Sequence, residues 1–420
     1  MDIFEVMVIG GGMAGLCAAL QEARAGAKTL LVEKNGLCGG TATVAGINFP
    51  GLFDAWGRQI IAGIGWELIT RTLQETGQAL PEQFLNPDSN RQHWRHQVRI
   101  NALLFAALAD EGLLEAGVDC RYHTMLATLQ HQREGWTAGL CGKDGLYEVQ
   151  SKMVIDCSGD ANATVIAGYE TRQPETTQPG TLSVIVNNYD CEKLDLALIA
   201  ANFAAAAARG EVEYCDIGWG KTFTGGFLRA HGSNSNHIAG SNAADSSGKT
   251  KLEIAGRRSI RRLYRFLKSQ PGLENLELQM VAGECGVRES RTIVGEATVS
   301  AEDYLAGRKY ADAICNAFYQ IDLHDADEGL IHRTLAPGVV PTVPLRALIP
   351  KQSQDFLAAG RILSSDRLAN SALRVQAVCM ATGQAAGAAA ALAAGSSCQP
   401  GAVPLPELHA LLRRHQAIVP

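Results

Sequence analysis

The N-terminal segment of the chain shows the hydrophobic pattern of a strand, a helix and a second strand. Residues 5–9 lack polar alternation, which is typical of a strand covered on both faces in a parallel sheet. A helix is expected from about Ala14 to Arg24, with Gly26 as its C-terminal stop. Residues 29–34 form a second apolar run, so we expect a β-α-β unit at the start of the chain.

Similar patterns return along the rest of the chain. They predict an amphipathic helix at 98–115, two or three strands within 118–149, a strand and helix at 152–168, a buried strand at 356–362 and a helix of small residues at 372–394. From about 170 to 345 the pattern changes, and this block includes a polar loop at 232–249. We therefore expect an α/β fold with a separate central lobe.

A glycine turn joins the first strand to the first helix. Gly10, Gly12 and Gly15 have the spacing Gly-x-Gly-x-x-Gly, in which the glycines allow a tight turn, a close approach to a pyrophosphate, and close packing of helix on strand. The helix N-terminus would face the phosphates. Glu33 ends the second strand, where a carboxylate can accept ribose hydroxyls. The alternative, an ordinary tight turn, leaves Glu33 without a role, so the pattern indicates a dinucleotide.

Composition narrows the class of partner. With 37 basic and 43 acidic residues the formal charge is −6, so nothing global attracts nucleic acid or an anionic membrane, and a small-molecule substrate is expected. The eleven cysteines are scattered without a Cys-x-x-Cys pair, as in reduced proteins. The first strand leaves no room for a secretory leader, which predicts a cytoplasmic location. The run 385–394 is too short for a membrane span.

Several segments together resemble one family. Besides the N-terminal unit, they are 154–168 (VIDCSGDANATVIAG), 285–296 (CGVRESRTIVGE), 319–325 (YQIDLHD) and 356–393, which begins FLAAGRILSSDR. In this order they resemble the FAD-dependent oxidoreductase family allied to the fumarate reductase and succinate dehydrogenase flavoproteins, within the glutathione-reductase superfamily. The resemblance implies an enzyme with FAD as its cofactor, and it leaves the substrate, the electron acceptor and the oligomeric state unknown.

The resemblance also implies an architecture and a set of cofactor contacts. It implies a Rossmann-like FAD-binding domain built discontinuously from 1–50, 96–170 and 346–400, an inserted α+β substrate or cap domain from 51–95 and 171–345, and a C-terminal helix or tail at 401–420. The residues expected at the cofactor are Gly10, Gly12, Ala14, Gly15, Glu33, Lys34, Gly39, Gly40, Thr41, Asp156, Gly159, Asp160, Gly360, Arg361, Arg374, Val375 and Gln376.

Two arginines in the central block are candidates for holding an anionic substrate. Arg288 and Arg291 are three positions apart, so on a helical turn they would share a face and form a fork for a carboxylate. The alternative is that either forms an ordinary ion pair with a nearby glutamate, at Glu284, Glu289 or Glu296.

A candidate base lies in a predicted strand. Alternation places Asp322 and His324 on one strand face, where the carboxylate would tune the imidazole into a base near neutral pH. A solvated strand face is the alternative. His231 and His237 border a polar loop without the carboxylates or the spacing of a metal site, so no metal is expected and a loop covering the substrate is the preferred interpretation.

These observations favour transfer of a hydride between a small polar or anionic metabolite and N5 of the flavin, with His324 as base and Arg288 as orienting cation. Reduction of an activated C=C bond, as in the fumarate reductase relatives, is the same chemistry reversed. An FAD-dependent RNA-modifying or RNA-binding protein is a rival, suggested by the arginines of 257–265, although the apolar spacing there is typical of an amphipathic helix. A nucleotide-binding interaction protein with a structural flavin is a further alternative.

Overall fold

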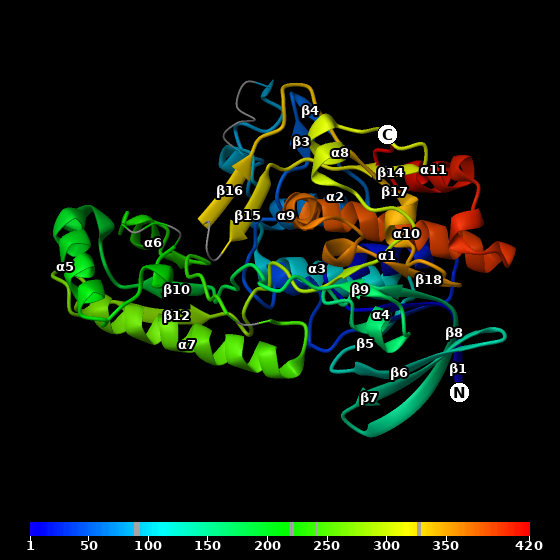
Figure 1. The fold of residues 1–420 in the computed structure, drawn as a ribbon, viewed down its shortest axis with the longest axis horizontal. Helices are drawn as coiled ribbons and strands as arrows, with labels where there is room; N and C mark the ends of the chain where they lie inside the picture. Colours follow the sequence, from blue (N-terminus) through cyan, green and yellow to red (C-terminus); the bar gives the residue numbers. More distant parts are fainter. Residues whose placement is uncertain (88–92, 219, 221, 241, 326–328) are drawn as a thin grey trace.

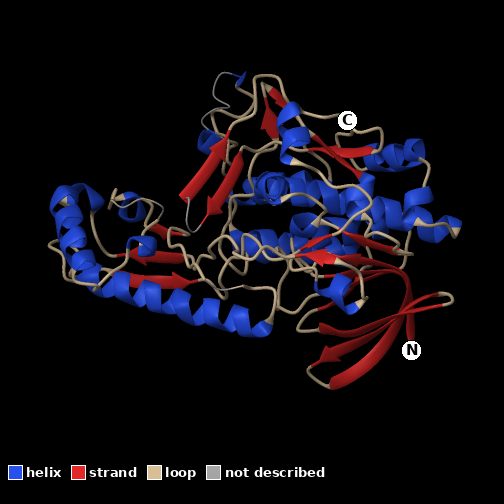
Figure 2. Ribbon diagram, viewed as in Figure 1, coloured by secondary structure: helices blue, strands red, loops and turns tan. Residues whose placement is uncertain are grey.

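The largest sheet of the described part of the chain has seven strands (Figure 1; strands red in Figure 2). The computed structural model describes residues 1–87, 93–218, 220, 222–240, 242–325 and 329–420. The sheet has the order β5 (Asp119–Arg121), β2 (Thr29–Val32), β1 (Asp2–Ile9), β8 (Gly145–Asp156), β7 (Gly135–Gly142) and β6 (Met125–Gln132), and β18 (Phe356–Ala358) also pairs with β8. β5, β2, β1, β8 and β18 are parallel, whereas β6 and β7 extend the sheet as an antiparallel hairpin.

The parallel strands end in register along one edge of the sheet. Ile9 lies opposite both Val32 and Asp156, and Ala358 also lies opposite Asp156. The loops that leave these strands therefore start side by side although they are far apart in sequence. This edge is where open α/β sheets usually bind ligands.

Two helices pack closely on the first parallel strands. α1 (Met13–Arg24) lies against α10 (Gln376–Ser396), and the contact is made by glycines. A Cβ at Gly383 would stand 2.0 Å from the carbonyl oxygen of Ala14, and one at Gly387 would stand 2.5 Å from that of Ala18. The two backbones thus touch at these positions.

α10 is the helix, among the described residues, that is long and apolar enough to cross a membrane. Within its most apolar window 89% of the residues are buried inside the protein, where they contact α1, α2 (Ile64–Thr76) and β14 (Ala313–Asn316). This burial is the environment of a core helix. The predicted cytoplasmic location stays a prediction.

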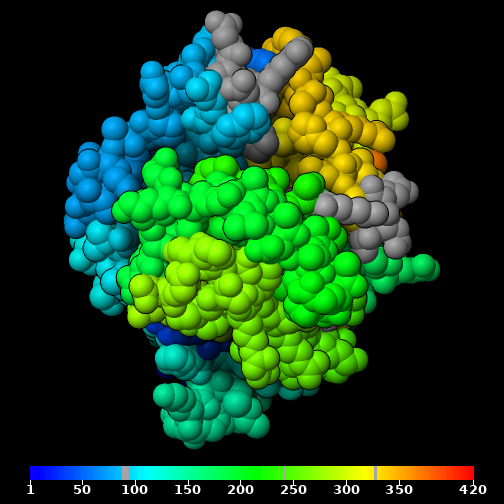
Figure 3. All heavy atoms as spheres, turned by 90° about the vertical axis from the view of Figure 1, so that its left-hand side faces the viewer, coloured from blue at the N-terminus to red at the C-terminus, as the bar shows by residue number. Residues whose placement is uncertain are grey.

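A second lobe stands beside the main body (Figures 1 and 3). It has a hydrophobic core of its own. It contains a small sheet in the order β11 (Gly232–Ser233), β10 (Val184–Asn187) and β12 (Glu277–Val281), together with α5 (Leu196–Ala208), α6 (Gly226–Arg229) and α7 (Ser246–Lys268). Phe203 on α5 packs edge-on against Phe266 on α7 at the centre of this core. We call residues 182–285 the cap lobe.

A two-stranded hairpin and a short helix pack together outside the two larger sheets. β15 (Ile321–Asp325) pairs with β16 (Gly329–Arg333), and α9 (Arg367–Leu373) packs on β15. The remaining elements are α3 (Ala102–Glu115), β3 (Asp54–Ala55), β4 (Arg58–Gln59), α4 (Asn162–Ile166), β9 (Thr171–Arg172), β13 (Thr292–Ile293), α8 (Ala301–Ala306), β17 (Thr342–Pro344), α11 (Leu405–Arg414) and short 3-10 helices.

The α/β fold class and the N-terminal β-α-β unit are confirmed, with two corrections to predicted elements. The strand expected at 356–362 ends at Ala358 and continues as a 3-10 turn, because Gly360 has a positive φ of 81°. The helix expected at 372–394 is two helices, interrupted where Val375 is extended (ψ 145°). All eleven cysteines are free thiols, as expected.

The predicted division into domains differs from the division of the structure into hydrophobic cores. Apolar side chains of 52–73 and 299–345, which the sequence assigns to the substrate domain, belong to the main core together with α1 and α10. The cap lobe is the part with a separate core. The boundaries therefore stay a prediction, with the cap lobe as its best-defined segment.

The glycine contact between α1 and α10 gives a stability prediction. We expect Gly383→Ala to lower the free energy of unfolding by about 1–3 kcal/mol, because the new methyl group would overlap the Ala14 carbonyl. Gly395→Ala is the matched control, since a Cβ there meets nothing within 4 Å on the same helix and alanine is the better helix former. Urea denaturation measures both, and equal stabilities of the two variants would contradict the packing argument.

Candidate active site

The glycine turn after β1 forms the first wall of the site. Gly10 has a φ of 101°, and a Cβ at Gly15 would lie 1.8 Å from the Gly10 carbonyl oxygen, so both positions exclude side chains. Gly12 differs, because its φ of −65° suits any residue and a Cβ there meets nothing within 4 Å. Its missing side chain leaves open space at the N-terminus of α1. Ala14, on the first turn of α1, lines the same space.

Glu33 follows β2 and closes the turn from the side. Its carboxylate accepts the amide N–H of Gly11 at 2.6 Å and that of Asn35 at 2.7 Å, and the residue is 6% exposed. These two bonds hold the carboxylate at the mouth of the glycine turn. Lys34 lines the same cavity, but its ammonium group pairs with Glu284 at 2.8 Å.

The loop at Gly39–Thr41 lies directly over the glycine turn. The Gly39 N–H donates to the Gly11 carbonyl, and a Cβ at Gly40 would lie 3.0 Å from the Cα of Gly12. Gly40 and Thr41 line the cavity, whereas Gly39, with a φ of 104°, makes the turn that brings them there. Backbone amides and one hydroxyl therefore border the open space beside Gly12.

The segment after β8 supplies a further wall, with one residue placed differently from expectation. Gly159 and Asp160 line the cavity, but Asp156 does not. Asp156 is fully buried and accepts the N–H groups of Ser158 and Thr164 and the Thr164 hydroxyl, so its carboxylate shapes the turn. The prediction that Asp156 reaches the cofactor is wrong in this respect. Burial raises its pKa, against the hydrogen bonds it accepts.

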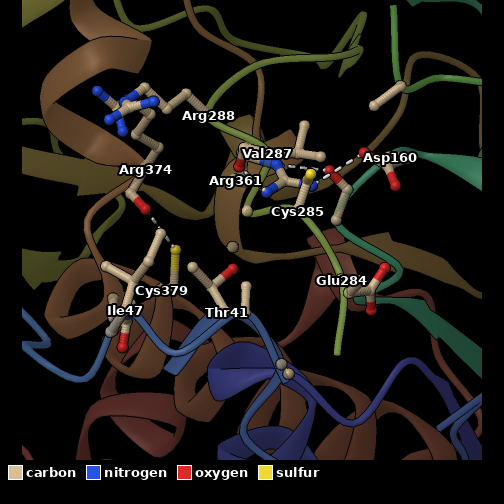
Figure 4. A pocket seen from close by; sticks show the side chains of 18 of the residues that line it. Thr41, Ile47, Asp160, Glu284, Cys285, Val287, Arg288, Arg361, Arg374 and Cys379 are labelled. Atoms are coloured by element: carbon tan, nitrogen blue, oxygen red, sulfur yellow. Dashed lines mark hydrogen bonds and ion pairs between the residues drawn. The ribbon is translucent and has the colours of Figure 1, made fainter. Parts of the chain in front are cut away.

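Arg361 ties three segments together behind the cavity. Its guanidinium donates to the carbonyl groups of Gly159 and Val287 and pairs with Asp160 at 2.9 Å (Figure 4). Gly360 precedes it, and a Cβ there would lie 2.9 Å from the Ala14 methyl group. Gly360 and Arg361 line the cavity, but the charge of Arg361 already has a carboxylate partner.

One large cavity connects these walls to the cap lobe. It has a volume of about 1200 Å³ and runs from Gly12 and Glu33 to the turn before α10, where Arg374, Val375 and Gln376 line it. At the Glu33 end the lining includes partly exposed apolar side chains, Met125, Val165 and Ile166. The cavity is thus apolar at one end, bordered by backbone amides in the middle, and charged at the other end.

The charged end contains two arginines, one aspartate and two histidines, namely Arg288, Arg374, Asp322, His237 and His324. The Arg288 Nη1 donates to the Pro179 carbonyl at 2.7 Å, and the Arg374 guanidinium contacts the Asp322 carbonyl at 3.2 Å and its carboxylate at 3.9 Å. Figure 4 shows the guanidinium ends of the two arginines close together. Nε of Arg374 is buried and has no hydrogen-bond partner among the described residues. This end therefore concentrates positive charge.

Asp322 and His324 share one face of β15, as predicted. The His324 Nε2 and the Asp322 carboxylate are 2.9 Å apart, and both side chains are mostly buried. Burial lowers the pKa of His324 to about 4, and Arg288 and Arg374 act in the same direction against Asp322. The expectation of a pKa near neutrality is wrong, because burial and the two guanidiniums outweigh the single carboxylate. The imidazole is neutral at pH 7.

The same charges act on the neighbouring groups. Burial and the adjacent charge of Arg374 lower the pKa of Arg288 to about 9. Burial opposes ionisation of Asp322, but the hydrogen bond from His324 and the nearby positive charges lower its pKa to about 2. Asp322 is thus an anion beside two cations.

Arg291 does not form the expected fork with Arg288. Residues 285–291 are irregular, so the expected helical turn is absent there, and the Arg291 guanidinium donates to Gln173 and to the Ala244 carbonyl. The alternative ion pairs of these arginines with Glu284 and Glu289 are not formed either. Glu284 pairs with Lys34 and Lys249, whereas Glu289 pairs with Arg367. Arg291 lines the cavity but stands apart from the charged end.

The sequence did not predict the roles of two residues at the charged end, Arg374 and His237. Arg374 was expected at the cofactor, and its side chain is the second guanidinium of the charged end. His237, expected in a loop over the substrate, stacks its ring on that of His324 with 5.7 Å between centroids. A hydrophobic pattern could not reveal either, although an arginine between two buried helices is a signal, since buried arginines need anionic partners.

Among the described residues, no group of three or more His, Cys, Asp or Glu side chains is arranged to hold a metal ion. The exposed arginines of α7, at 257, 258, 261 and 265, do not line the cavity. The expectation that the protein has no nucleic-acid partner stays a prediction.

Comparisons with known proteins identify the family. The family model described as FAD dependent oxidoreductase matches residues 5–412. No curated protein matches the sequence. Among solved structures, the chain is distantly similar to a geranylgeranyl bacteriochlorophyll reductase-like protein from Thermoplasma acidophilum, with 14% identity, coverage of 99% of this chain and 83% of that one, and a TM-score of 0.46. It is also similar to p-nitrophenol 4-monooxygenase from Pseudomonas putida, with 10% identity, coverage of 99% and 85%, and a TM-score of 0.44. A third similar structure is anhydrotetracycline hydroxylase from Streptomyces rimosus, with 13% identity, coverage of 99% and 66%, and a TM-score of 0.44.

The family match extends over nearly the whole chain and agrees with the glycine turn, the acid after β2 and the parallel sheet. The wider assignment to the glutathione-reductase superfamily stays a prediction. The protein belongs to the FAD-dependent oxidoreductase family and is an enzyme with FAD as its cofactor.

Proposed function

We propose that the enzyme transfers a hydride between a small anionic metabolite and N5 of the flavin. In this proposal His324 is the general base, and Arg288 and Arg374 hold the anionic group of the substrate. The observation that carries the proposal is the pair of buried guanidiniums beside Asp322 and His324 at one end of the cavity.

The cavity fits FAD at its other end. The open space at Gly12 and the amides around Gly40 suit a pyrophosphate at the N-terminus of α1, and the fixed carboxylate of Glu33 suits ribose hydroxyls. The apolar side chains of Met125 and Ile166 suit a flat base beyond the ribose. When bound, FAD supplies the acceptor or donor of the hydride.

The two guanidiniums favour an anionic substrate. A buried charge is costly unless an opposite charge lies beside it, and here Asp322 is one carboxylate between two arginines. A carboxylate on the substrate would offset the remaining positive charge and accept hydrogen bonds from the planar donor groups. Binding would thereby exclude neutral analogues of the same shape.

The hydrogen bond to Asp322 fixes the tautomer of the His324 imidazole. An ionised carboxylate only accepts hydrogen bonds, so the proton of the neutral His324 ring is on Nε2 and the basic lone pair is on Nδ1. A base with a lone pair suits oxidation of the substrate, whereas reduction of a C=C bond needs a protonated donor. The neutral imidazole therefore favours the oxidative direction over the fumarate-reductase-like alternative.

Substrate binding would also change the strength of the base. Arg288 and Arg374 help to keep the His324 pKa low in the free protein. A bound carboxylate offsets these charges, so the pKa of His324 is expected to rise in the complex. The base would then accept a proton more readily when substrate is present.

The open space at Gly12 gives a prediction on cofactor binding. We expect Gly12→Val to fold normally, since the backbone suits any residue, and to weaken FAD binding at least about 100-fold by filling the space for the pyrophosphate. Fluorescence titration of apoprotein with FAD measures the affinity, and circular dichroism verifies the fold. A variant that stays fully loaded with FAD would contradict the proposed pyrophosphate position.

His324 gives a prediction on pH dependence. As pH falls through about 4, the free imidazole gains a proton and can no longer act as base, so kcat/KM should fall there. The corresponding limb of kcat should lie at higher pH, because it reports the complex. His324→Ala should retain FAD, lose both limbs and slow anaerobic flavin reduction by at least about 100-fold. Reduction at the parental rate would exclude His324 as the base.

The two central arginines give a matched pair of variants. Arg288→Gln should lower kcat/KM for a carboxylate substrate by about 100-fold or more, since it removes a charged contact in a buried site. Arg291→Gln should stay within a few-fold of the parent, because Arg291 is bound by Gln173 and the Ala244 carbonyl away from the charged end. Steady-state kinetics on both variants tests the assignment, and equal losses would refute it.

A further inference from the structure

The charged end of the cavity also restricts the group at the reacting carbon of the substrate. This inference rests on the proposed function, because it concerns the same site. We propose that the substrate is a 2-hydroxy acid, whose reacting carbon bears an uncharged hydroxyl group, and that His237 of the cap lobe contacts the hydroxyl oxygen. The site would discriminate against the corresponding amino acid, whose reacting carbon bears an ammonium group.

The arrangement of rings and charges carries the proposal. The His237 and His324 rings stack at 5.7 Å with 23° between their planes, and both residues line the cavity beside Arg288 and Arg374. A ligand whose carboxylate reaches the guanidiniums therefore has its neighbouring carbon beside two imidazoles. Neutral imidazoles donate and accept hydrogen bonds, which suits a hydroxyl group.

Electrostatics disfavour an ammonium group at the same place. Burial lowers the pKa of His237 to about 2, and the charge of Arg288 adds to the effect. Burial and the arginine charges, which keep both imidazoles unprotonated, would also disfavour a cation on the ligand. Asp322 is the carboxylate that the described part of the chain places beside these groups, and it already accepts the His324 proton.

The oxidation of such a substrate balances with the groups present. The hydroxyl proton passes to Nδ1 of His324, the C2–H bond breaks with its electron pair leaving as a hydride to FAD, and the C–O single bond becomes a carbonyl. The substrate loses two electrons and becomes a 2-oxo acid, and the cofactor gains them. His237 would hold the oxygen in place during the change.

The test uses two ligands that the enzyme cannot oxidise, because their C2 carries no hydrogen. 2-Hydroxyisobutyrate and 2-aminoisobutyrate share one carboxylate and one carbon skeleton and differ only in the hydroxyl or ammonium group. Calorimetric titration of the FAD-loaded enzyme at pH 7 should show the hydroxy acid binding at least about 10-fold more tightly than the amino acid. Isobutyrate, with the carboxylate alone, should bind with intermediate affinity.

The outcomes separate this proposal from the function on which it rests. If isobutyrate and the hydroxy acid bind but the amino acid binds as tightly or more tightly, the inference is wrong while the anion site stands. If none of the three ligands binds, the anion site fails, and the inference fails with it.

A variant of His237 tests its contact with the hydroxyl group. His237→Phe keeps a flat ring at the stacking position but cannot form the hydrogen bond. It should weaken 2-hydroxyisobutyrate binding by about 3- to 10-fold and leave isobutyrate binding unchanged, as expected for one lost hydrogen bond. Equal loss for both ligands would assign His237 a merely structural role and overturn the proposed contact.

Discussion

The contact between the backbones of α1 and α10 is the constraint on which the site depends. Gly383 and Gly387 let α10 lie against the carbonyl groups of Ala14 and Ala18, so both helices begin at the same edge of the sheet. The glycine turn before α1 and the turn before α10 are thereby fixed at the two sides of one cavity. A larger residue at either glycine would force the helices apart and separate the glycine turn from the charged end.

The charged end shows how burial sets the chemistry of a site. Two guanidiniums, one carboxylate and two imidazoles lie where water is mostly excluded, so each charge acts strongly on its neighbours. Burial and the arginine charges keep the histidines neutral, and the aspartate fixes which ring nitrogen of His324 has the proton. Neither effect requires contact with the solvent.

The sequence predicted the parts of the site that follow from local backbone geometry. Gly10 and Gly15 make the expected close approaches, Gly12 leaves open space, and Glu33 lies at the mouth of the glycine turn, because these features lie within one β-α-β unit. The pairing of Asp322 with His324 was also predictable, since alternation along a strand fixes which side chains share a face.

Features that depend on distant segments were not predictable in the same way. The fork of Arg288 and Arg291 relied on a helical turn that the tertiary structure replaces with an irregular segment, and the actual partner, Arg374, is far away in sequence. The pKa of His324 depends on how many cations surround it, which a strand pattern cannot show. Asp156 was expected at the cofactor, yet its carboxylate is buried and accepts hydrogen bonds from Ser158 and Thr164 in the turn after β8.

The separate core of the cap lobe has a consequence for how the enzyme can diversify. His324 and Arg374 stand on elements of the main body, whereas His237 belongs to the lobe. Substitutions in the lobe interior would therefore alter the cap side of the cavity while leaving the packing of the main core intact. The lobe is a unit in which the shape of the cavity can change independently of the central sheet.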